Sequence, residues 1–274
     1  MAAPRCCFDT SEYTGLPDTT PVLNPMDVPA ALSEYDILNF SGRIDEAEVC
    51  LDALLNEAMC RGDWRAQLSF LSEMAGLCRN TGKRDKALSA IDEALELLKS
   101  HGLGRTVSGA TVILNCATTM KHFGMAEDSI PLFKHVSRVF SDMLDPSDYR
   151  FAGLFNNMGL SYCDMGDYAS AERCFRLAIG VLEKCGNADN DIAVSYCNLA
   201  NLYDSVSHED ERINECAEKA WEHLNVPSLP FDSYHAYTIS KCLSCFDRFG
   251  FFLYAAELRR RMEAINSEVG DERT

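Results

Sequence analysis

The chain has 274 residues, of which 47% are hydrophobic, and this content excludes a globally disordered protein. Its 42 acidic and 25 basic residues give a net charge of −17, which argues against nucleic acid or an anionic membrane as the main partner, because Lys and Arg drive phosphate binding. An acidic surface mildly favours basic or neutral peptides, and it also serves solubility alone.

The 13 cysteines are scattered along the chain, mostly inside apolar stretches, as at Cys78, Cys116 and Cys197. Buried free cysteine packs as a small hydrophobic residue, so we expect a reducing compartment rather than a disulfide framework. Residues 1–8 lack the apolar run of a signal peptide, and no stretch of the sequence approaches the length of a membrane span. The sequence therefore predicts a cytoplasmic protein.

Residues 1–30 differ from the rest because they contain five of the nine prolines. Proline at this density breaks helical periodicity, so we expect an extended or disordered N-terminal tail. A tail attached to a groove-forming array has a high effective concentration for that groove. Residues 9–29 are therefore also a candidate intramolecular plug.

From residue 31 onward, a turn residue is followed five positions later by a small or β-branched residue. The pairs are Gly42/Ala47, Gly82/Ala87, Gly166/Ala171 and Gly250/Ala255, with Gly124/Ser129 a close variant and His208/Ile213 a degenerate one. Successive glycines from Gly42 to Gly166 are 40 or 42 residues apart. A fixed period of this size indicates a repeat array.

Apolar residues recur three and four positions apart on both sides of each turn, which describes two amphipathic helices in an antiparallel hairpin. Two such helices approach to about 8–10 Å only where the side chains at their crossing are small. The first helices supply small residues at one column, namely Ala75, Ala117, Gly159 and Ala200. The sequence predicts six hairpins of this kind.

The segment from Leu154 to Ala178 resembles the tetratricopeptide repeat. Its residues Phe155, Gly159, Tyr162, Gly166, Ala171, Phe175 and Ala178 follow the family's order of aromatic, Gly, Tyr, Gly, Ala, Phe and Ala. The resemblance implies an all-α fold, a right-handed α-solenoid superhelix of about six antiparallel helical hairpins. We expect this array over residues 31–268, with residues 269–274 as a C-terminal tail.

Three features depart from the family pattern. The period is longer than the family's, which is about 34 residues, and arrays of this longer type resemble those of kinesin light chains and of bacterial peptide-sensing regulators. Tyr35 stands where a small residue is expected, and Arg259 where an aromatic one is. Residues 205–208 replace the turn glycine of the fifth hairpin, so we expect a distorted turn there.

Asparagines gather on the predicted first helices of three successive hairpins. Asn115, Asn157 and Asn198 share one column, which in the repeat family lines the concave groove. An Asn side chain offers one acceptor and two donors, enough to pair with the main chain of an extended peptide. The alternative interpretation is that some of these side chains bridge neighbouring first helices. The candidate peptide-binding residues on this face are Asn115, Thr118, Lys121, Asn156, Asn157, Asn198, Asn201, Lys241 and Arg248.

No catalytic or metal-binding set emerges from the sequence. Cys242 and Cys245 have C-x-x-C spacing, but no second ligand pair lies at matching spacing, so we expect no metal and no cofactor. The six histidines are dispersed, and no glycine-rich phosphate loop is present.

These observations predict a non-enzymatic scaffold that binds a protein or peptide segment and no nucleic acid or membrane. The alternative is a ligand-sensing regulator of the bacterial peptide-pheromone receptor type. Such regulators pair the array with an N-terminal helical DNA-binding or bundle domain, for which residues 1–30 are too short and too rich in proline. The sequence leaves the oligomeric state open.

Overall fold

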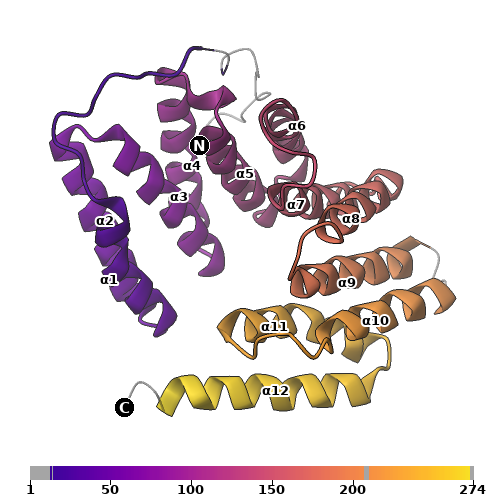
Figure 1. Cartoon of the computed structure of the whole chain (residues 1–274). Coiled ribbons are helices and arrows are strands. Elements are labelled where there is room, and N and C mark those ends of the chain that lie inside the picture. The colour runs from indigo at the N-terminus through magenta and orange to yellow at the C-terminus, as the bar shows by residue number, and fades with distance from the viewer. Residues whose placement is uncertain (1–12, 14, 207–209, 272–274) are drawn as a thin grey trace. The chain divides into compact units, whose positions relative to one another are not determined.

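The structure, a computed structural model, describes residue 13, residues 15–206 and residues 210–271 (Figure 1). The regular elements among these residues are α-helices and short 3-10 turns, with no strand, so the all-α prediction is confirmed. The helices are α1 (Val28–Phe40), α2 (Ile44–Arg61), α3 (Trp64–Asn80), α4 (Arg84–Ser100), α5 (Val107–His122), α6 (Ala126–Met143), α7 (Arg150–Asp164), α8 (Tyr168–Leu182), α9 (Asp189–Val206), α10 (Asp210–Leu224), α11 (Ser233–Arg248) and α12 (Phe252–Asp271), with the 3-10 turn η2 (Leu103–Arg105) before α5.

The chain divides into two compact units, residues Met1–Leu144 with α1 to α6 and residues Asp145–Thr274 with α7 to α12. Within each unit successive helices pack pairwise, as α1 with α2, α3 with α4 and α5 with α6, and as α7 with α8, α9 with α10 and α11 with α12. The predicted helical hairpins are thereby confirmed.

Glycines in the left-handed region end the first helix of most hairpins. The turn glycines Gly42, Gly82, Gly124, Gly166 and Gly250 have φ between 71° and 81°, a range that other residues rarely adopt. The distorted turn expected at residues 205–208 includes residues 207 and 208, which lie outside the described part of the chain.

The first unit also uses such a glycine between hairpins. Gly62 has φ 67° and, with Asp63, forms the whole connection from α2 to α3. The Asp63 carboxylate accepts from the Ala66 N–H at 3.1 Å and so caps α3. Left-handed glycines therefore recur every 20 residues from Gly42 through Gly62 and Gly82 to Gly102.

The small residues predicted at the helix crossings are buried. Ala75, Ala117 and Ala200 on the first helices are at most 1% exposed. Gly159 shows why they must be small, because a Cβ built there would lie 2.6 Å from a ring carbon of Phe175 on α8. Phe175 is itself fully buried and has no room to move aside.

The segment before α1 lies against the first unit as an N-terminal strap, defined as residues 13 and 15–27. The Asp18 N–H donates to the His101 carbonyl at 2.8 Å, and the Met26 N–H donates to the Asp63 carboxylate at 2.8 Å. Tyr13 is only 6% exposed and lies against Gly104. These contacts lie at the connections between hairpins, so the described residues form a strap across helix ends rather than a plug along the first-helix face.

The ends of the array differ slightly from the expected boundaries. Helix α1 begins at Val28 rather than at residue 31, because Asp27 accepts from the Ala30 N–H and Pro29 is compatible with a first turn. Helix α12 continues to Asp271, past residue 268, where we expected the C-terminal tail to begin. None of the described helices is both long and apolar enough to cross a bilayer.

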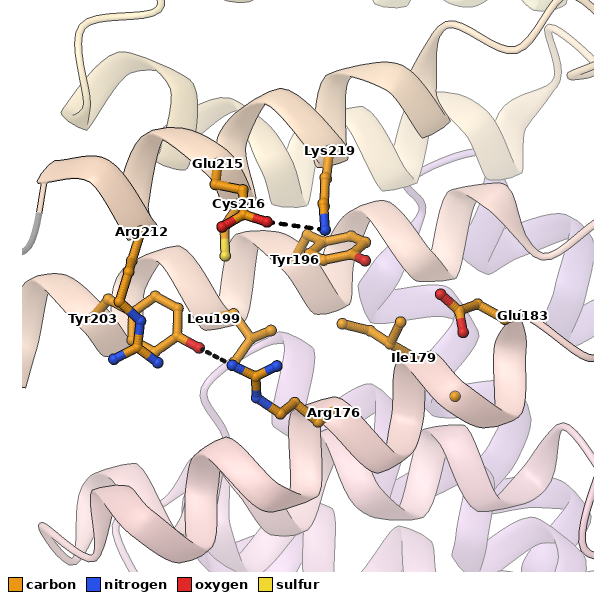
Figure 2. Close-up of a pocket in the computed structure, with 11 residues that line it drawn as sticks. Arg176, Ile179, Glu183, Tyr196, Leu199, Tyr203, Arg212, Glu215, Cys216 and Lys219 are labelled. Carbon is orange, nitrogen blue, oxygen red and sulfur yellow. Dashed lines mark hydrogen bonds and ion pairs between the residues drawn. The ribbon is translucent and has the colours of Figure 1, made fainter.

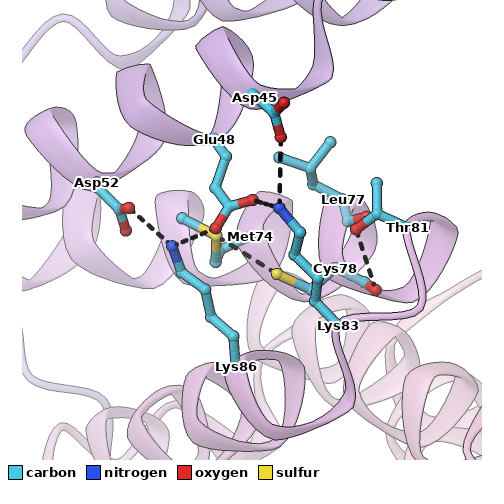
Figure 3. Close-up of polar contacts among 9 residues, drawn as sticks. All are labelled: Asp45, Glu48, Asp52, Met74, Leu77, Cys78, Thr81, Lys83 and Lys86. Atoms are coloured by element: carbon cyan, nitrogen blue, oxygen red, sulfur yellow. Dashed lines mark hydrogen bonds and ion pairs between the residues drawn. The ribbon is translucent and has the colours of Figure 1, made fainter.

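Ion pairs join the second helices of the first two hairpins (Figure 3). Glu48 on α2 pairs with Lys83, which precedes α4, and at 2.8 Å with Lys86 on α4. Lys86 also reaches Asp52 at 2.7 Å. The hydrogen bonds from the two lysines outweigh the effect of burial and lower the pKa of Glu48, which keeps this carboxylate charged.

The tight crossing at Gly159 predicts opposite effects for two glycine substitutions on α7. Gly159→Ala is expected to lower the free energy of unfolding by about 1–3 kcal/mol, because the added methyl group overlaps Phe175. Gly153→Ala, where a Cβ would meet nothing within 4 Å, is expected to raise it by about 0.5–1 kcal/mol through helix propensity. Denaturant unfolding measures both free energies. If Gly159→Ala stabilised the protein, the close contact between residue 159 and Phe175 would be contradicted.

A second substitution tests the strap. A Cβ at residue 104 would lie 2.4 Å from the Tyr13 Cβ, so Gly104→Ala is expected to release the strap. The readout is hydrogen exchange of the Asp18 amide, which should become at least tenfold faster. Gly186→Ala, at a position with open space, is the control and should leave this amide protected.

Candidate peptide-binding face

The first helices of the second unit, α7, α9 and α11, bring six of the nine candidate residues together. They are Asn156 and Asn157 on α7, Asn198 and Asn201 on α9, and Lys241 and Arg248 on α11. The other three, Asn115, Thr118 and Lys121, lie on α5 of the first unit. We call the α7–α9–α11 set the second-unit face.

The contacts that α9 makes with its two neighbours show which side of α9 belongs to this face. Ser195 accepts a hydrogen bond from the Asn156 amide of α7 at 2.9 Å, and Asp204 forms an ion pair with Arg248 of α11. Residues three positions apart on an α-helix are separated by about 60° around the helix axis. Asn198 and Asn201 therefore lie between the side of α9 that meets α7 and the side that meets α11.

The asparagines divide into two groups. Asn156 donates to Ser195 on α9, and Asn115 donates to Ser72 on α3 at 3.0 Å, so both bridge neighbouring first helices. The Asn156 Oδ1 atom is buried and has no partner among the described residues. For these two residues the bridging interpretation describes the observed contacts.

The other three asparagines make no contact of this kind. The Asn157 amide donates only to the Gly153 carbonyl of its own helix, at 2.9 Å. The side chains of Asn198 and Asn201 are partly exposed, and within the described part of the chain they form no hydrogen bond. Their donors and acceptors are available to a ligand on the second-unit face.

Helix α11 adds a strip of exposed residues that the sequence reasoning used only in part. Tyr234, Tyr237, Lys241, Ser244 and Arg248 follow one another at spacings of three and four residues, and all are exposed. The Lys241 ammonium lies 4.9 Å from the centre of the Tyr237 ring. The tyrosines were missed, although the same spacing that selected Lys241 identifies them.

Tyr234 is held in place by α9. Its hydroxyl donates to the Asp191 carboxylate at 2.7 Å. Burial, together with this carboxylate, raises the pKa of Tyr234, so the hydroxyl remains a donor at neutral pH. The ring therefore presents a fixed aromatic edge at the start of α11.

The candidate residues of the first unit show a different arrangement. Thr118 donates to the Leu114 carbonyl of its own helix at 2.8 Å. Arg79 of α3 donates to Thr119 of α5 at 3.4 Å, beside the Asn115 bridge. In the first unit, several polar side chains on the first helices are thus engaged in contacts between α3 and α5.

The cysteine pair of α11 belongs to the core. Cys242 and Cys245 are at most 1% exposed and pack with Cys197 and Phe246. No group of three or more His, Cys, Asp or Glu side chains suited to a metal ion occurs among the described residues. The second-unit face itself offers amides, two phenol rings and two cations, which suit hydrogen bonding and side-chain recognition.

Comparison with known proteins places this geometry in a family. Residues 150–211, which span α7, α8, α9 and the start of α10, match the family model of the tetratricopeptide repeat. No curated protein matches the chain.

Several solved structures share the fold at low sequence identity. The TPR-like repeats assigned to a kinesin light chain of Podosopora anserina are 13% identical, with 74% of this chain and 96% of that chain covered and a TM-score of 0.53. PilW, a type IV pilus biogenesis factor, is 12% identical over 88% and 94%, with a TM-score of 0.57. NprR in complex with its cognate peptide NprX is 15% identical over 89% and 70%, also with a TM-score of 0.57.

These likenesses establish the fold, and the matched segment includes the α7–α8 hairpin, which carries the intact repeat order. Left-handed turn glycines recur in four other hairpins, at Gly42, Gly82, Gly124 and Gly250. Small buried crossing residues recur at Ala75, Ala117 and Ala200. Residues 150–211 therefore match the tetratricopeptide-repeat family, and the described chain shares the fold of solved TPR-like structures.

Proposed function

We propose that this protein is a non-enzymatic scaffold that binds an extended peptide segment of a partner protein across the second-unit face. The observation that carries the proposal is the set of three asparagines, Asn157, Asn198 and Asn201, whose amides form no hydrogen bond to another helix among the described residues. Polar side chains with this freedom on adjacent helices suit a ligand that supplies both donors and acceptors.

The spacing of the helices suits an extended main chain. Packed helices lie about 8–10 Å apart, and an extended peptide advances about 3.3 Å per residue. A peptide that crosses from one helix to the next therefore advances by about three residues, so we expect one asparagine contact for about every three peptide residues. Such contacts hold the main chain and place little demand on the peptide sequence.

Side-chain preference would come from α11. Tyr234 and Tyr237 offer aromatic surface to an apolar or aromatic peptide side chain, and Lys241 beside them offers a positive charge. Arg248 is already paired with Asp204 and serves mainly to hold α11 against α9. A peptide with an aromatic residue followed by an acidic one fits this strip best.

The proposal includes a cytoplasmic location and excludes nucleic acid as a partner. The net charge of −17 disfavours phosphate backbones. The described cysteines are all free, which is consistent with a reducing compartment.

The alternative function is that of a peptide-sensing regulator. It is favoured by the shared fold with NprR, which was solved with its cognate peptide. The matched region covers 70% of the NprR chain, so part of that protein has no counterpart in the alignment. Both functions use the same kind of ligand and differ in what peptide binding controls.

The peptide-binding proposal predicts a specific pattern of losses. Peptides selected on the wild-type protein from a random library should bind Asn157→Ala, Asn198→Ala or Asn201→Ala about fivefold to tenfold more weakly, the effect of one lost hydrogen bond. The loss should be similar for peptides of unrelated sequence, because the contact is to the main chain. Fluorescence anisotropy measures the dissociation constants.

Asn266→Ala on the exposed side of α12 is the matched control, and it should leave the affinity unchanged. The melting temperature should stay within experimental error for all four variants, because no contact between helices is removed. Unchanged affinity in all three face variants would refute the proposed site.

Asn156 should behave differently, because it joins α7 to α9. A double-mutant cycle with Asn156→Ala and Ser195→Ala is expected to give a coupling energy of about 0.5–1.5 kcal/mol in the free energy of unfolding. The cycle cancels the separate effect of removing the buried Oδ1 atom. A coupling energy of zero would mean that the bridge does not contribute in solution.

A further inference from the structure

An apolar groove lies between α1 and α2 at the first hairpin, and we call it the end groove. It has a volume of about 700 Å³. Ile37 of α1 and Val49 of α2 line it and are each 67% exposed, and Ala53 and Leu54 line it beside them. The outer faces of terminal repeats are usually polar, because they meet solvent. Apolar side chains on such a face indicate that another molecule covers the end groove.

The second unit has an equivalent groove between α9 and α10, which we call the internal groove (Figure 2). Counted from the crossing residues Ile213 and Ala47, its α10 residues Arg212, Glu215, Cys216 and Lys219 stand at the repeat positions of Glu46, Val49, Cys50 and Ala53, which line the end groove. Leu199 and Tyr203 on α9 match Glu34 and Leu38 on α1 in the same way. The two grooves are therefore the same surface of two different hairpins.

The internal groove is covered by α8, the second helix of the preceding hairpin. Glu172 of α8 accepts from Arg212 at 2.7 Å, and Arg176 of α8 donates to the Tyr203 hydroxyl at 3.0 Å (Figure 2). Among the described residues no hairpin precedes α1, and the end groove is lined by α1, α2 and their turn alone. The repeat itself thus indicates that the end groove fits the second helix of a further hairpin.

Helix α12, the second helix of the last hairpin, presents the matching face. Counted from the crossing residues Ala171 and Ala255, the α8 residues Arg176, Ile179, Gly180 and Glu183 of the internal groove correspond to Arg260, Glu263, Ala264 and Ser267, all of them exposed. Phe252 and Leu253 at the start of α12 are 67% and 85% exposed. The described chain therefore has a groove without a covering helix at the first hairpin and a helix without a groove at the last.

The charges of the two surfaces are partly complementary. Glu34 forms no ion pair within the described ranges, and on α12 Arg260 and Arg261 share one carboxylate, that of Glu257. Arg176 reaches from α8 to α9, so Arg260 at the same repeat position is expected to reach α1, where Glu34 lies. Glu263 faces the same way and opposes this attraction. Apolar contacts therefore supply most of the affinity.

We propose that the protein associates head to tail, with α12 of a second copy bound in the end groove as α8 is bound in the internal groove. The two surfaces differ, so the contact is heterologous, and each pair keeps one free groove and one free helix to which further chains can add. The contact uses neither the asparagines nor α11. It goes beyond the proposed peptide-binding function and does not depend on it.

Sedimentation velocity of the full chain at increasing concentration tests this association. The weight-average mass should rise continuously with concentration, because a heterologous contact does not close at the dimer. A chain that stays monomeric at a concentration of about 1 mM would overturn the proposal.

Variants of α2 block the groove without a new fold. Val49→Glu combined with Ala53→Lys copies Glu215 and Lys219, which stand at the same positions of α10 and pair there at 3.1 Å. This double variant should weaken association at least tenfold. Met59→Glu is the control, because Met59 is an exposed apolar residue of α2 outside the groove lining, and it should associate like the wild type. Unchanged association of the double variant would contradict the groove.

A variant of α12 shows whether the two surfaces meet each other. Ala256→Glu copies Glu172, which stands at the same position of α8, and it brings a carboxylate toward Glu46 and Glu34. This variant should also be monomeric. Mixed with the groove double variant it should form one-to-one dimers and nothing larger, since one intact groove and one intact helix remain. Association of Ala256→Glu alone, or a mixture that stays monomeric, would refute the head-to-tail contact.

Glu263 provides a test in the opposite direction. Glu263→Lys replaces a repulsion with an attraction at the acidic groove and should tighten association about fivefold, the effect of one exposed ion pair. Equal or weaker association of this variant would contradict the orientation of α12 in the end groove.

Discussion

The close approach of the two helices in each hairpin is the constraint on which the rest of this structure depends. It is met by small residues at Ala75, Ala117 and Ala200, and at Gly159 even one methyl group would overlap Phe175. Because each first helix is held from behind by its second helix, its opposite side is left to solvent or to a ligand. The positions of Asn157 and Asn198 follow from this packing and from helical period alone.

The hairpins could be predicted from the sequence because their determinants are local. A left-handed glycine and a small residue five positions later lie within one turn and one helix start, as at Gly166 and Ala171. Gly62 is also a left-handed glycine, but Gln67 stands five positions later and the turn joins two hairpins, so Gly62 falls outside the pattern that the reasoning followed. The strap was not predictable, because Tyr13 and Gly104 meet only in the folded unit.

The candidate site could be predicted as a face but not residue by residue. The sequence placed Asn156 and Asn157 in one group, whereas the structure separates a bridge from an available side chain. That difference depends on Ser195, which is 39 residues away from Asn156 and carries no signal of its own. A column of identical residues therefore indicates which side of the helix they lie on. Whether each one bridges to the next helix or stays available depends on the residue opposite it on that helix.

The ion pairs of the second helices have a consequence for how the protein responds to its solvent. Glu48 with Lys86 and Glu172 with Arg212 occupy the same two repeat positions, one directly after and one directly before the crossing residue of successive hairpins. They join neighbouring hairpins, whereas each hairpin is held together by buried apolar side chains. Because salt screens exposed charges and leaves burial intact, ionic strength acts on the cooperativity between hairpins rather than on the hairpins themselves. In dilute salt each unit should unfold in a sharper transition, and in concentrated salt its end hairpins should fray first.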